Sequence, residues 1–354
     1  MNIKKIIRKN IDLLIPYESA RSLGNQGKVF LNANELPFSF VFCNKHLNRY
    51  PECQPKILIQ YYADYVNLNT NQILVTRGAD EGIQLLMTAF CEPKKDCIII
   101  CPPTYGMYYV SAQIIGIKCH LINLLPNWQL NILEIMKKIN NTKIIYICRP
   151  NNPTGNVFSF NDINKLLRMT KNKLLIVIDE AYIEFCKNET LVKLMEKYSH
   201  LVILRTLSKA FGLASIRCGF VLANTLIINS LLKVIAPYPI STIVTDIAIQ
   251  GLSKSKLSVM KKNIFSINKN KEWLINNLKT CPLVKKVFPS KTNYILVRFL
   301  QSQAIFRFLL NKGIVLRNQN SYIDLSECLR ITIGSYKECK NLLHVLNSFP
   351  MESI

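Results

Sequence analysis

The sequence predicts an α/β protein in which a mostly parallel sheet flanked by helices forms a large domain, followed by a smaller α+β domain. A chain of 354 residues is longer than one hydrophobic core usually supports, so two domains are expected. From residue 73 to about residue 250, short apolar runs alternate with segments of helical periodicity, and beyond that this pattern changes. We predict an N-terminal arm with part of the small domain at 1–47, the large domain at 48–250 and the small domain at 251–354.

The composition is typical of a folded protein. Hydrophobic residues make up 49% and charged residues 19% of the chain, which argues against disorder. No apolar segment approaches the ~18 residues that a membrane span needs, and the N-terminus carries no secretory pattern, so we expect a cytoplasmic protein without a membrane partner. The twelve cysteines are scattered without a C-x-x-C pair and indicate reduced, packed thiols and no metal site.

The net charge of +23 would be compatible with a nucleic-acid partner. The Lys and Arg residues, however, are spread along the chain among many Asn and Ile residues, as A+T-rich coding would produce. A basic excess alone specifies no site. We therefore expect no nucleic-acid partner, although a basic nucleic-acid-binding protein remains the alternative from a different functional class. Anionic substrates are compatible with this charge.

The first part of the chain indicates loops and then the start of the large domain. About the first 30 residues show no pattern of a packed element and are interpreted as an arm, and the Asn- and Pro-containing segments 31–37 and 49–52 predict loops. An apolar strand at 73–75 and a turn precede a helix at 80–91. Gly78 and Ala79 therefore lie before a helix N-terminus, where backbone N–H groups bind anions or are simply capped.

Four further apolar runs in the large domain each end in a polar cluster. Near-continuous apolar strands predict a parallel sheet buried on both faces, and ligands of such sheets bind at the carboxyl ends of the strands. We therefore expect the polar clusters to be neighbours in space. The runs are 97–101 before Tyr105, 144–148 before Asn152, 174–178 before Asp179 and Tyr182, and 201–204 before Ser208 and Lys209.

The small domain is predicted from a different order of elements. A Lys- and Asn-rich helix is expected at 255–278. It is followed by strands at 293–299, 314–317 and 328–333 and by helices at 301–311 and 338–346.

The stretch from Leu204 to Phe220 carries the first indication of chemistry. Lys209 follows a buried strand, and partial desolvation there would lower the pKa of its amine, so that it could attack a carbonyl. Arg217 supplies a fixed cation at the next strand boundary. Together they suggest an aldehyde that carries a phosphate, whereas Ser208 and Lys209 alone are more simply interpreted as a solvated pair at a strand end.

Pyridoxal phosphate would find every partner it needs on this predicted sheet edge. Its ring nitrogen requires a carboxylate, its ring oxygen requires uncharged donors, one ring face requires an aromatic residue, and its phosphate requires N–H donors and a cation. Asp179 is the candidate carboxylate, Asn152 and Tyr182 are the candidate donors to the ring oxygen, and Tyr105 is the candidate aromatic residue. The candidates for binding the phosphate are Ala79 with Gly78, Ser208 and Arg217.

Several motifs, in order along the chain, are similar to those of a known family. The segments T-L-S-K-A-F-G-L-A-S-I-R-C-G-F, R-P-N-N-P-T-G-N and V-I-D-E-A-Y-I-E-F resemble the fold-type I pyridoxal-phosphate aminotransferases. Within them, L-N-A-N-E, R-Y-P-E-C-Q-P, T-R-G-A-D-E-G-I-Q-L-L, C-P-P-T-Y-G-M-Y, I-A-P-Y-P-I-S and C-L-R-I-T-I-G resemble the histidinol-phosphate aminotransferases. The similarity runs from about residue 16 to about residue 334.

The resemblance implies a homodimeric fold-type I transferase that exchanges an amino group between L-histidinol phosphate and 2-oxoglutarate, giving imidazole acetol phosphate and L-glutamate in histidine biosynthesis. It implies catalytic roles for Lys209, Asp179 and Tyr182. The cofactor-binding residues would be these three with Asn152, Tyr105, Ala79, Asp80, Ser208 and Arg217, and Tyr50 from the partner subunit. Asp80 would bind through its backbone, since its carboxylate would repel a phosphate.

The substrate phosphate would be bound by arginine. The resemblance implies that Arg330, with Arg317 and Tyr17, holds this dianion and that Asn34 is a further substrate contact. Arg317 and Tyr17 could instead make surface pairs. Arg149 departs from the small residue that relatives carry there, and it is expected either to face solvent or to attract the phosphate-bearing substrate.

Three other activities stay open at the level of the sequence. A related enzyme with the same cofactor could decarboxylate an amino-acid phosphate, and an aromatic aminotransferase would use the same motifs. A catalytically silent dimeric scaffold is disfavoured because no position with an implied role is lost.

Overall fold

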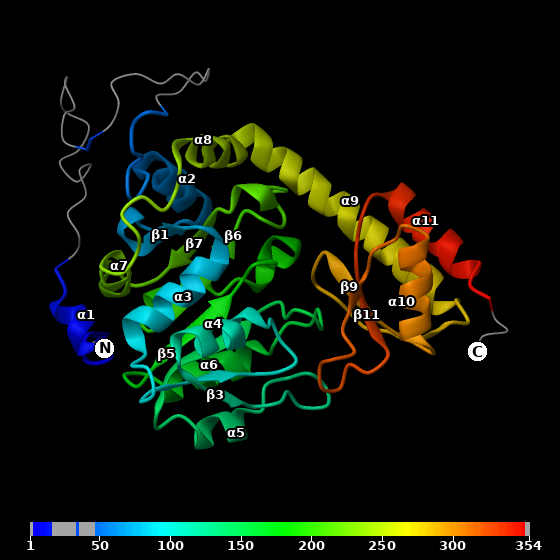
Figure 1. The fold of residues 1–354 in the computed structure, drawn as a ribbon, viewed down its shortest axis with the longest axis horizontal. Helices are drawn as coiled ribbons and strands as arrows, with labels where there is room; N and C mark the ends of the chain where they lie inside the picture. Colours follow the sequence, from blue (N-terminus) through cyan, green and yellow to red (C-terminus); the bar gives the residue numbers. More distant parts are fainter. Residues whose placement is uncertain (1–2, 16–32, 35–46, 351–354) are drawn as a thin grey trace.

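The computed structural model describes residues 3–15, 33–34 and 47–350. A large sheet with its helices forms one part of the molecule, and a smaller sheet with three helices forms the other (Figure 1). The long helix α9 (Lys254–Lys279) runs from the first part to the second.

The large sheet has seven strands, and most neighbours are parallel. Only β7 runs antiparallel to both of its neighbours. The predicted mostly parallel sheet is therefore confirmed. In spatial order the strands are β1 (Ile73–Thr76), β7 (Gly219–Leu222), β6 (Leu201–Thr206), β5 (Leu175–Asp179), β4 (Thr142–Cys148), β2 (Cys97–Ile100) and β3 (Lys118–Leu121).

Both faces of this sheet are covered because alternate residues of each strand enter different cores. In β4, Ile145 and Ile147 belong to one core, while Ile144 and Tyr146 belong to the other. The first core includes residues of α2 (Lys56–Val66), α5 (Ile132–Lys137), α6 (Phe160–Met169) and α8 (Thr242–Gly251). The second includes residues of α3 (Gly78–Phe90), α4 (Met107–Ile115) and α7 (Thr225–Leu232).

The N-terminal segment is packed where the structure describes it, which corrects the interpretation that it contains no packed element. Ile3, Ile6 and Ile11 are buried in the second core, beside the short elements η1 (Ile3–Lys5) and α1 (Lys9–Leu13). Arg8 forms an ion pair with Glu92 at 3.1 Å. The sequence did not reveal this packing because three widely spaced isoleucines give little periodicity. The domain boundaries themselves stay a prediction.

The small sheet is antiparallel and packs against three helices. Its order is β10 (Arg317–Asn318), β11 (Cys328–Thr332), β9 (Tyr294–Phe299) and β8 (Val284–Val287). The helices are α9, α10 (Ser302–Asn311) and α11 (Tyr336–Asn347), and they share one core with the sheet. The strand expected at 314–317 is only two residues long and begins at Arg317, because the chain leaves α10 through Gly313 with a φ of 78°.

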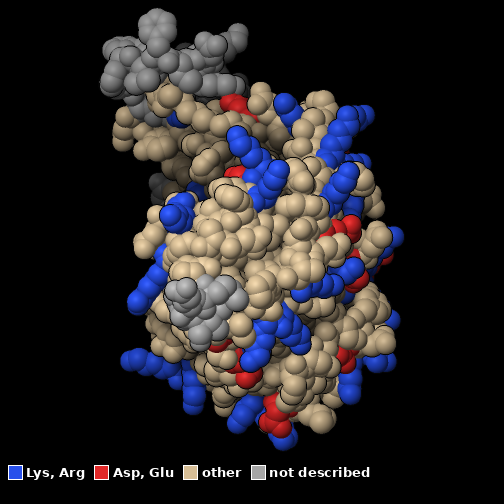
Figure 2. Space-filling model, turned by 90° about the vertical axis from the view of Figure 1, so that its right-hand side faces the viewer, with Lys and Arg blue, Asp and Glu red and all other residues tan. Residues whose placement is uncertain are grey.

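The remaining elements are short 3₁₀ helices in the connections. They are η2 (Thr70–Gln72), η3 (Ile183–Glu189), η4 (Val192–Glu196) and η5 (Ala214–Ile216). Within the described residues, no helix is long and apolar enough to cross a membrane. Lys and Arg side chains are spread over the face shown in Figure 2 and are interspersed with a few acidic ones.

Candidate active site

A cavity of about 630 Å³ lies at the carboxyl ends of the large-sheet strands, where the small sheet approaches them. Its wall contains most of the residues that the sequence singled out, although they are far apart along the chain. These are Ala79, Asp80, Tyr105, Asn152, Asp179, Tyr182, Ser208, Lys209, Arg217, Arg317 and Arg330. Residues from both domains therefore meet at one site.

Two described residues to which the resemblance assigns roles are not in this wall. Tyr50 and Asn34 line a different cavity of about 340 Å³, together with Pro51 and Ser241. The ring of Tyr50 stacks on Tyr238 with 4.4 Å between centroids. Tyr17 lies outside the described residues. Within one chain, the structure therefore does not bring Tyr50 or Asn34 to the large cavity.

One end of the cavity is built for an anion. Gly78 is the first residue of α3 and has a φ of 76°, and a Cβ atom at this position would lie 2.7 Å from Nη2 of Arg217. The glycine thus lets the guanidinium lie directly over the helix start. Arg217 donates to the hydroxyl of Ser208 at 3.3 Å and to the carboxylate of Asp80 at 3.2 Å.

A buried carboxylate lies at the end of β5. Asp179 accepts hydrogen bonds from the hydroxyl of Tyr108 at 2.7 Å and from the N–H of Ala181 at 3.0 Å. Burial raises the pKa of Asp179 to about 6, although the hydrogen bonds from Tyr108 and Ala181 oppose the shift. A cation placed beside this carboxylate would relieve the cost of its burial.

Tyr108 is a functional candidate that sequence reasoning missed. It is fully buried in α4, and its ring contacts that of Tyr105 edge-on at 5.6 Å. The hydroxyl of Tyr105 in turn donates to Asp80 at 2.9 Å. The sequence carries no clear signal for Tyr108, because Tyr105 lies before the start of α4 and helical spacing does not relate the two tyrosines.

Lys209 projects into the cavity beyond the end of β6. Its Nζ atom lies 5.5 Å from the centre of the Tyr182 ring. Although the side chain is exposed to the cavity, neighbouring protein atoms replace part of its water shell. This desolvation, with the positive charge of Arg330, lowers the pKa of Lys209, while Asp179 and Asp80 act in the opposite direction.

Arg330 reaches the cavity from the small sheet and is only partly hydrogen-bonded. Its Nη1 donates to the side-chain oxygen of Asn152 at 2.5 Å, and its guanidinium lies 5.1 Å from the centre of the Tyr294 ring. The buried Nε–H has no partner among the described residues. Arg330 thus lines the cavity with a guanidinium that has one side-chain acceptor, Asn152, among the described residues.

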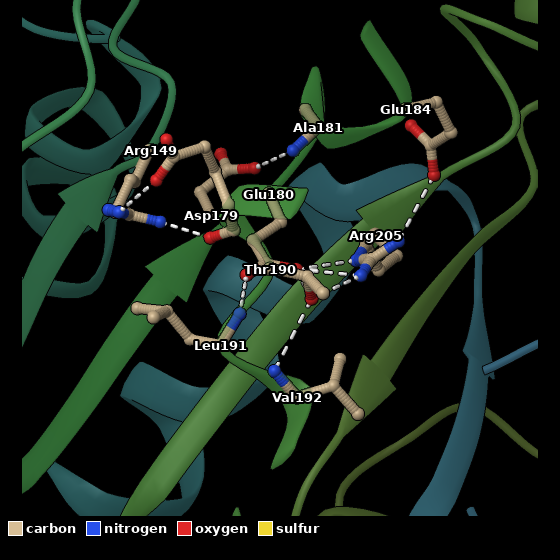
Figure 3. A network of polar contacts seen from close by, with 10 residues as sticks. Arg149, Asp179, Glu180, Ala181, Glu184, Thr190, Leu191, Val192 and Arg205 are labelled. Atoms are coloured by element: carbon tan, nitrogen blue, oxygen red, sulfur yellow. Dashed lines mark hydrogen bonds and ion pairs between the residues drawn. The ribbon is translucent and has the colours of Figure 1, made fainter. Parts of the chain in front are cut away.

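A second polar cluster lies directly behind the end of β5 (Figure 3). Arg205 on β6 contacts Glu180 at 2.7 Å, Glu184 at 3.1 Å and the hydroxyl of Thr190 at 3.0 Å. Glu180 also accepts the N–H of Leu191 at 2.7 Å. This cluster fixes the chain on both sides of Tyr182.

Arg149 corrects both expectations for that position. The side chain is 1% exposed and does not line the large cavity. Its Nε donates to the carbonyl of Phe158 at 3.0 Å, and its other nitrogens contact the carboxylate of Glu189 at 2.8 Å and the Glu189 carbonyl. It is therefore a buried structural residue, because Glu189 supplies a partner that the local sequence around residue 149 does not show.

Comparisons with known proteins agree with this architecture. Residues 31–346 match the family described as Aminotransferase class I and II. The histidinol-phosphate aminotransferase of Buchnera aphidicola subsp. Diuraphis noxia is 55% identical over 98% of this chain and 96% of its own length. That of Escherichia coli O45:K1 is 51% identical, with 98% of each chain covered.

The fold is shared with solved structures. The crystal structure of the histidinol-phosphate aminotransferase from Clostridium acetobutylicum has a TM-score of 0.79 and 26% sequence identity, and the match covers 85% of this chain and 90% of that one. The chain therefore belongs to the class I and II aminotransferases, which depend on pyridoxal phosphate, and within them to the histidinol-phosphate aminotransferases.

Proposed function

We propose that the protein transfers the amino group of L-histidinol phosphate to 2-oxoglutarate, giving imidazole acetol phosphate and L-glutamate, as a step of histidine biosynthesis. Relatives at 51–55% identity over nearly the whole chain carry this name. The single observation that supports the activity best is that Lys209, Asp179 and Arg330 line one cavity, although they come from two sheets.

The residues present fit the cofactor. Asp179 is a buried carboxylate without a cationic hydrogen-bond partner among the described residues, and the protonated ring nitrogen of pyridoxal phosphate would be that cation. Arg217, Ser208 and the backbone around Ala79 would bind the cofactor phosphate. When bound, the cofactor withdraws electrons from the substrate carbon and so weakens its bond to hydrogen.

Lys209 would hold the cofactor and then move the proton. Its lowered pKa increases the fraction of neutral amine, so that Nζ can accept the proton from the substrate Cα and return it to the C4′ atom of the cofactor. Positioned proton transfer of this kind contributes about 10²–10⁴-fold to a rate. The Tyr182 ring beside Nζ restricts where the amine can point.

The other cavity residues would orient the cofactor ring. Asn152 and Tyr182 are the donors for its ring oxygen, and Tyr105 is the aromatic residue that stacks on it. The carboxylate of Asp80 is already engaged by Arg217 and Tyr105, which leaves the backbone of this residue to approach the phosphate.

The phosphate of the substrate would be bound from the small domain. Arg330 and Arg317 face each other across the β10–β11 pair, so two guanidinium groups reach the same part of the cavity. Tyr17 would add a hydroxyl and Asn34 a further contact to the substrate. Arg330 lines the cavity and has one side-chain acceptor, Asn152, among the described residues, which supports this assignment.

A homodimer would complete the site, with Tyr50 reaching the cofactor phosphate of the partner subunit, and the enzyme would work in the cytoplasm. Tyr50 and Asn34 share a cavity that is separate from the large one in their own chain. Residues that act in trans are expected to lie away from the site of their own chain. Tyr50→Phe should weaken cofactor binding without changing the dimer, as measured by absorbance titration and by sedimentation.

The Lys209→Ala variant tests the central assignment. We expect loss of the absorbance that the bound cofactor gives near the visible edge, and at least a ~10²-fold fall in kcat. Lys197→Ala is the matched control, because Lys197 also lies 5.5 Å over a tyrosine ring but outside the cavity. Full turnover in Lys209→Ala would exclude the proposed mechanism.

Product analysis separates the proposal from a decarboxylase with the same cofactor. Purified protein would be supplied with histidinol phosphate, histidine, phenylalanine or aspartate, together with 2-oxoglutarate. Formation of glutamate fastest with histidinol phosphate is the expected result. Release of carbon dioxide from an amino-acid phosphate without glutamate would favour the decarboxylase instead.

A further inference from the structure

The wall of the large cavity contains a buried glutamine that has no role in the proposal above. Gln319 follows β10 and is 3% exposed. Its backbone is satisfied, since its N–H donates to the Cys328 carbonyl at 3.0 Å and its carbonyl accepts the N–H of Tyr322 at 3.0 Å. Its side-chain amide makes no hydrogen bond to any residue that the structure describes. The amide therefore lines the cavity with its hydrogen-bonding capacity unused by the described residues.

The neighbouring amides show that this is specific to Gln319. Asn318 donates to the side chain of Gln303 at 2.8 Å. Asn320 donates to Ser302 at 2.8 Å and accepts the N–H of Cys328 at 3.0 Å. Both flanking side chains are therefore used to hold the loop, and only the amide between them is left for another partner.

The strand register places Gln319 beside the two cavity arginines. Arg317 pairs directly with Arg330 across β10 and β11, and the N–H of Gln319 continues the ladder to Cys328. Residues two apart on an extended strand lie on the same side. Arg317, Gln319 and Arg330 therefore belong to one side of this strand pair, and all three line the cavity.

The loop that carries Gln319 also contacts the opposite wall. A Cβ atom at Gly106 would lie 3.2 Å from the hydroxyl of Tyr322, so this tyrosine packs against the start of α4. The contact holds the loop over the cavity between the two domains. Gln319 is thus positioned by the protein fold and not by a side-chain partner of its own.

We propose that Gln319 is a further specificity-determining residue, whose amide N–H₂ group donates to the phosphate monoester of the amino donor between Arg317 and Arg330. A phosphate dianion has more lone pairs than two guanidinium groups use, and an amide adds a donor without adding charge. This inference rests on the proposed function and names one more residue that would select its phosphate-bearing substrate.

Two substitutions in the holoenzyme test it. Gln319→Leu keeps the approximate side-chain volume and removes the N–H₂ donor. Gln319→Glu keeps the side-chain shape and places a negative charge next to the substrate phosphate dianion. We expect kcat/KM for histidinol phosphate to fall about tenfold or more in Gln319→Leu and further in Gln319→Glu, mainly through KM. For histidine or phenylalanine, which carry no phosphate, we expect changes below about threefold.

Gln303→Glu is the matched control. It makes the same change of charge in the same domain, and its retained oxygen can still accept from Asn318 outside the cavity. We expect wild-type kcat/KM for histidinol phosphate in this control. Cofactor absorbance and the thermal midpoint are compared in all variants, because a folding defect would lower turnover of every donor alike.

Inorganic phosphate provides a probe that does not depend on the identity of the natural substrate. Its competitive inhibition constant, measured with whichever donor the wild type uses, should rise about tenfold or more in Gln319→Glu and not in Gln303→Glu. An unchanged inhibition constant would overturn the inference. An equal loss of kcat/KM for donors with and without phosphate would also overturn it, because it would indicate that Gln319 contacts another part of the substrate. Failure of the wild type to use histidinol phosphate, with phosphate inhibition still dependent on residue 319, would refute the proposed function alone.

Discussion

Two arginines lie near the end of β5 and differ in how completely they are paired. Arg205 is buried and contacts the two carboxylates of Glu180 and Glu184. Arg330 has one side-chain acceptor, Asn152, and a buried Nε–H without a partner among the described residues. A fully paired guanidinium has no capacity left for a ligand, whereas a partly paired one does. The comparison separates a structural arginine from one that is available for binding.

The pKa values of Arg205 and Asp179 show the same contrast. Burial alone would lower the pKa of Arg205, but Glu180 and Glu184 outweigh it and raise the pKa above its usual value. Asp179 has only neutral hydrogen-bond donors, and burial raises its pKa. Charges behind the sheet edge are thus compensated within the chain, whereas Asp179 and Arg330 at the cavity have no ion-pair partner among the described residues and are left for a ligand to compensate.

The largest expected effect is on stability, from the paired arginine. Arg205→Met leaves two buried carboxylates without their cation, so the free energy of unfolding should fall by about 3–5 kcal/mol. The measurement is denaturation of the holoenzyme by urea, with the exposed Arg307→Met as control. For the variant that remains folded, KM for histidinol phosphate should stay within about threefold of wild type. A large change in KM without loss of stability would contradict the division between the two arginines.

Arg330→Leu should show the opposite pattern. Removing a cation that pairs with a substrate dianion should lower kcat/KM about a hundredfold, while the free energy of unfolding changes by less than about 1 kcal/mol. Steady-state kinetics and urea denaturation measure the two quantities. Arg307→Leu serves as the control. If Arg330→Leu unfolds as readily as Arg205→Met, then Arg330 is a structural residue.

Sequence reasoning identified the cavity residues that follow strands and missed those that depend on packing. Lys209, Asp179 and Asn152 were found because the carboxyl ends of parallel strands share one edge of the sheet. Tyr108 and Gln319 were missed because each lies on an element whose inward face is fixed only by the folded chain. The apolar pattern predicted the mostly parallel sheet in the same way, through properties local to each strand.

Pairing between residues far apart in the sequence explains why both expectations for Arg149 were wrong. Arg149 is neutralised by Glu189 forty residues later, and Arg205 by Glu180 and Glu184 in the preceding connection. The sequence around a buried arginine does not identify its acidic partner. A structural arginine therefore cannot be distinguished, from sequence alone, from an arginine that binds a ligand. The resemblance to a family supplied Arg330, which the strand pattern alone would not have distinguished from Arg149.

A third prediction concerns Asp179 in the protein without cofactor. Its pKa is raised to about 6, so as the pH rises from about 4 to 6 the unfolded chain loses the proton first and the free energy of unfolding falls. Asp179→Asn removes this loss and should stabilise the cofactor-free protein by about 2 kcal/mol at pH 7, with little effect at pH 4. Urea denaturation at the two pH values measures it.

Asp179→Asn, which should stabilise the cofactor-free protein, should be unfavourable once the cofactor is bound. The ring nitrogen then pairs with the carboxylate, so Asp179→Asn should bind pyridoxal phosphate more weakly and lose most of its turnover. Glu134→Gln, on an exposed residue paired with Lys137, is the control and should change stability by less than about 0.5 kcal/mol. Destabilisation of the cofactor-free protein by Asp179→Asn would mean that the carboxylate is already compensated within the chain.

The smallest effect is expected for Arg149, whose partner is partly exposed. The side chain of Glu189 is 41% exposed, so water already screens the pair, and Arg149→Met should lower the free energy of unfolding by about 1–2 kcal/mol, less than Arg205→Met. KM for histidinol phosphate should not change, because Arg149 does not line the cavity. A higher KM in Arg149→Met than in the wild type, with the difference abolished by 1 M salt, would instead assign Arg149 to substrate attraction. Equal losses of stability for the two arginine variants would show that burial of the guanidinium, and not the number of its carboxylate partners, determines the cost.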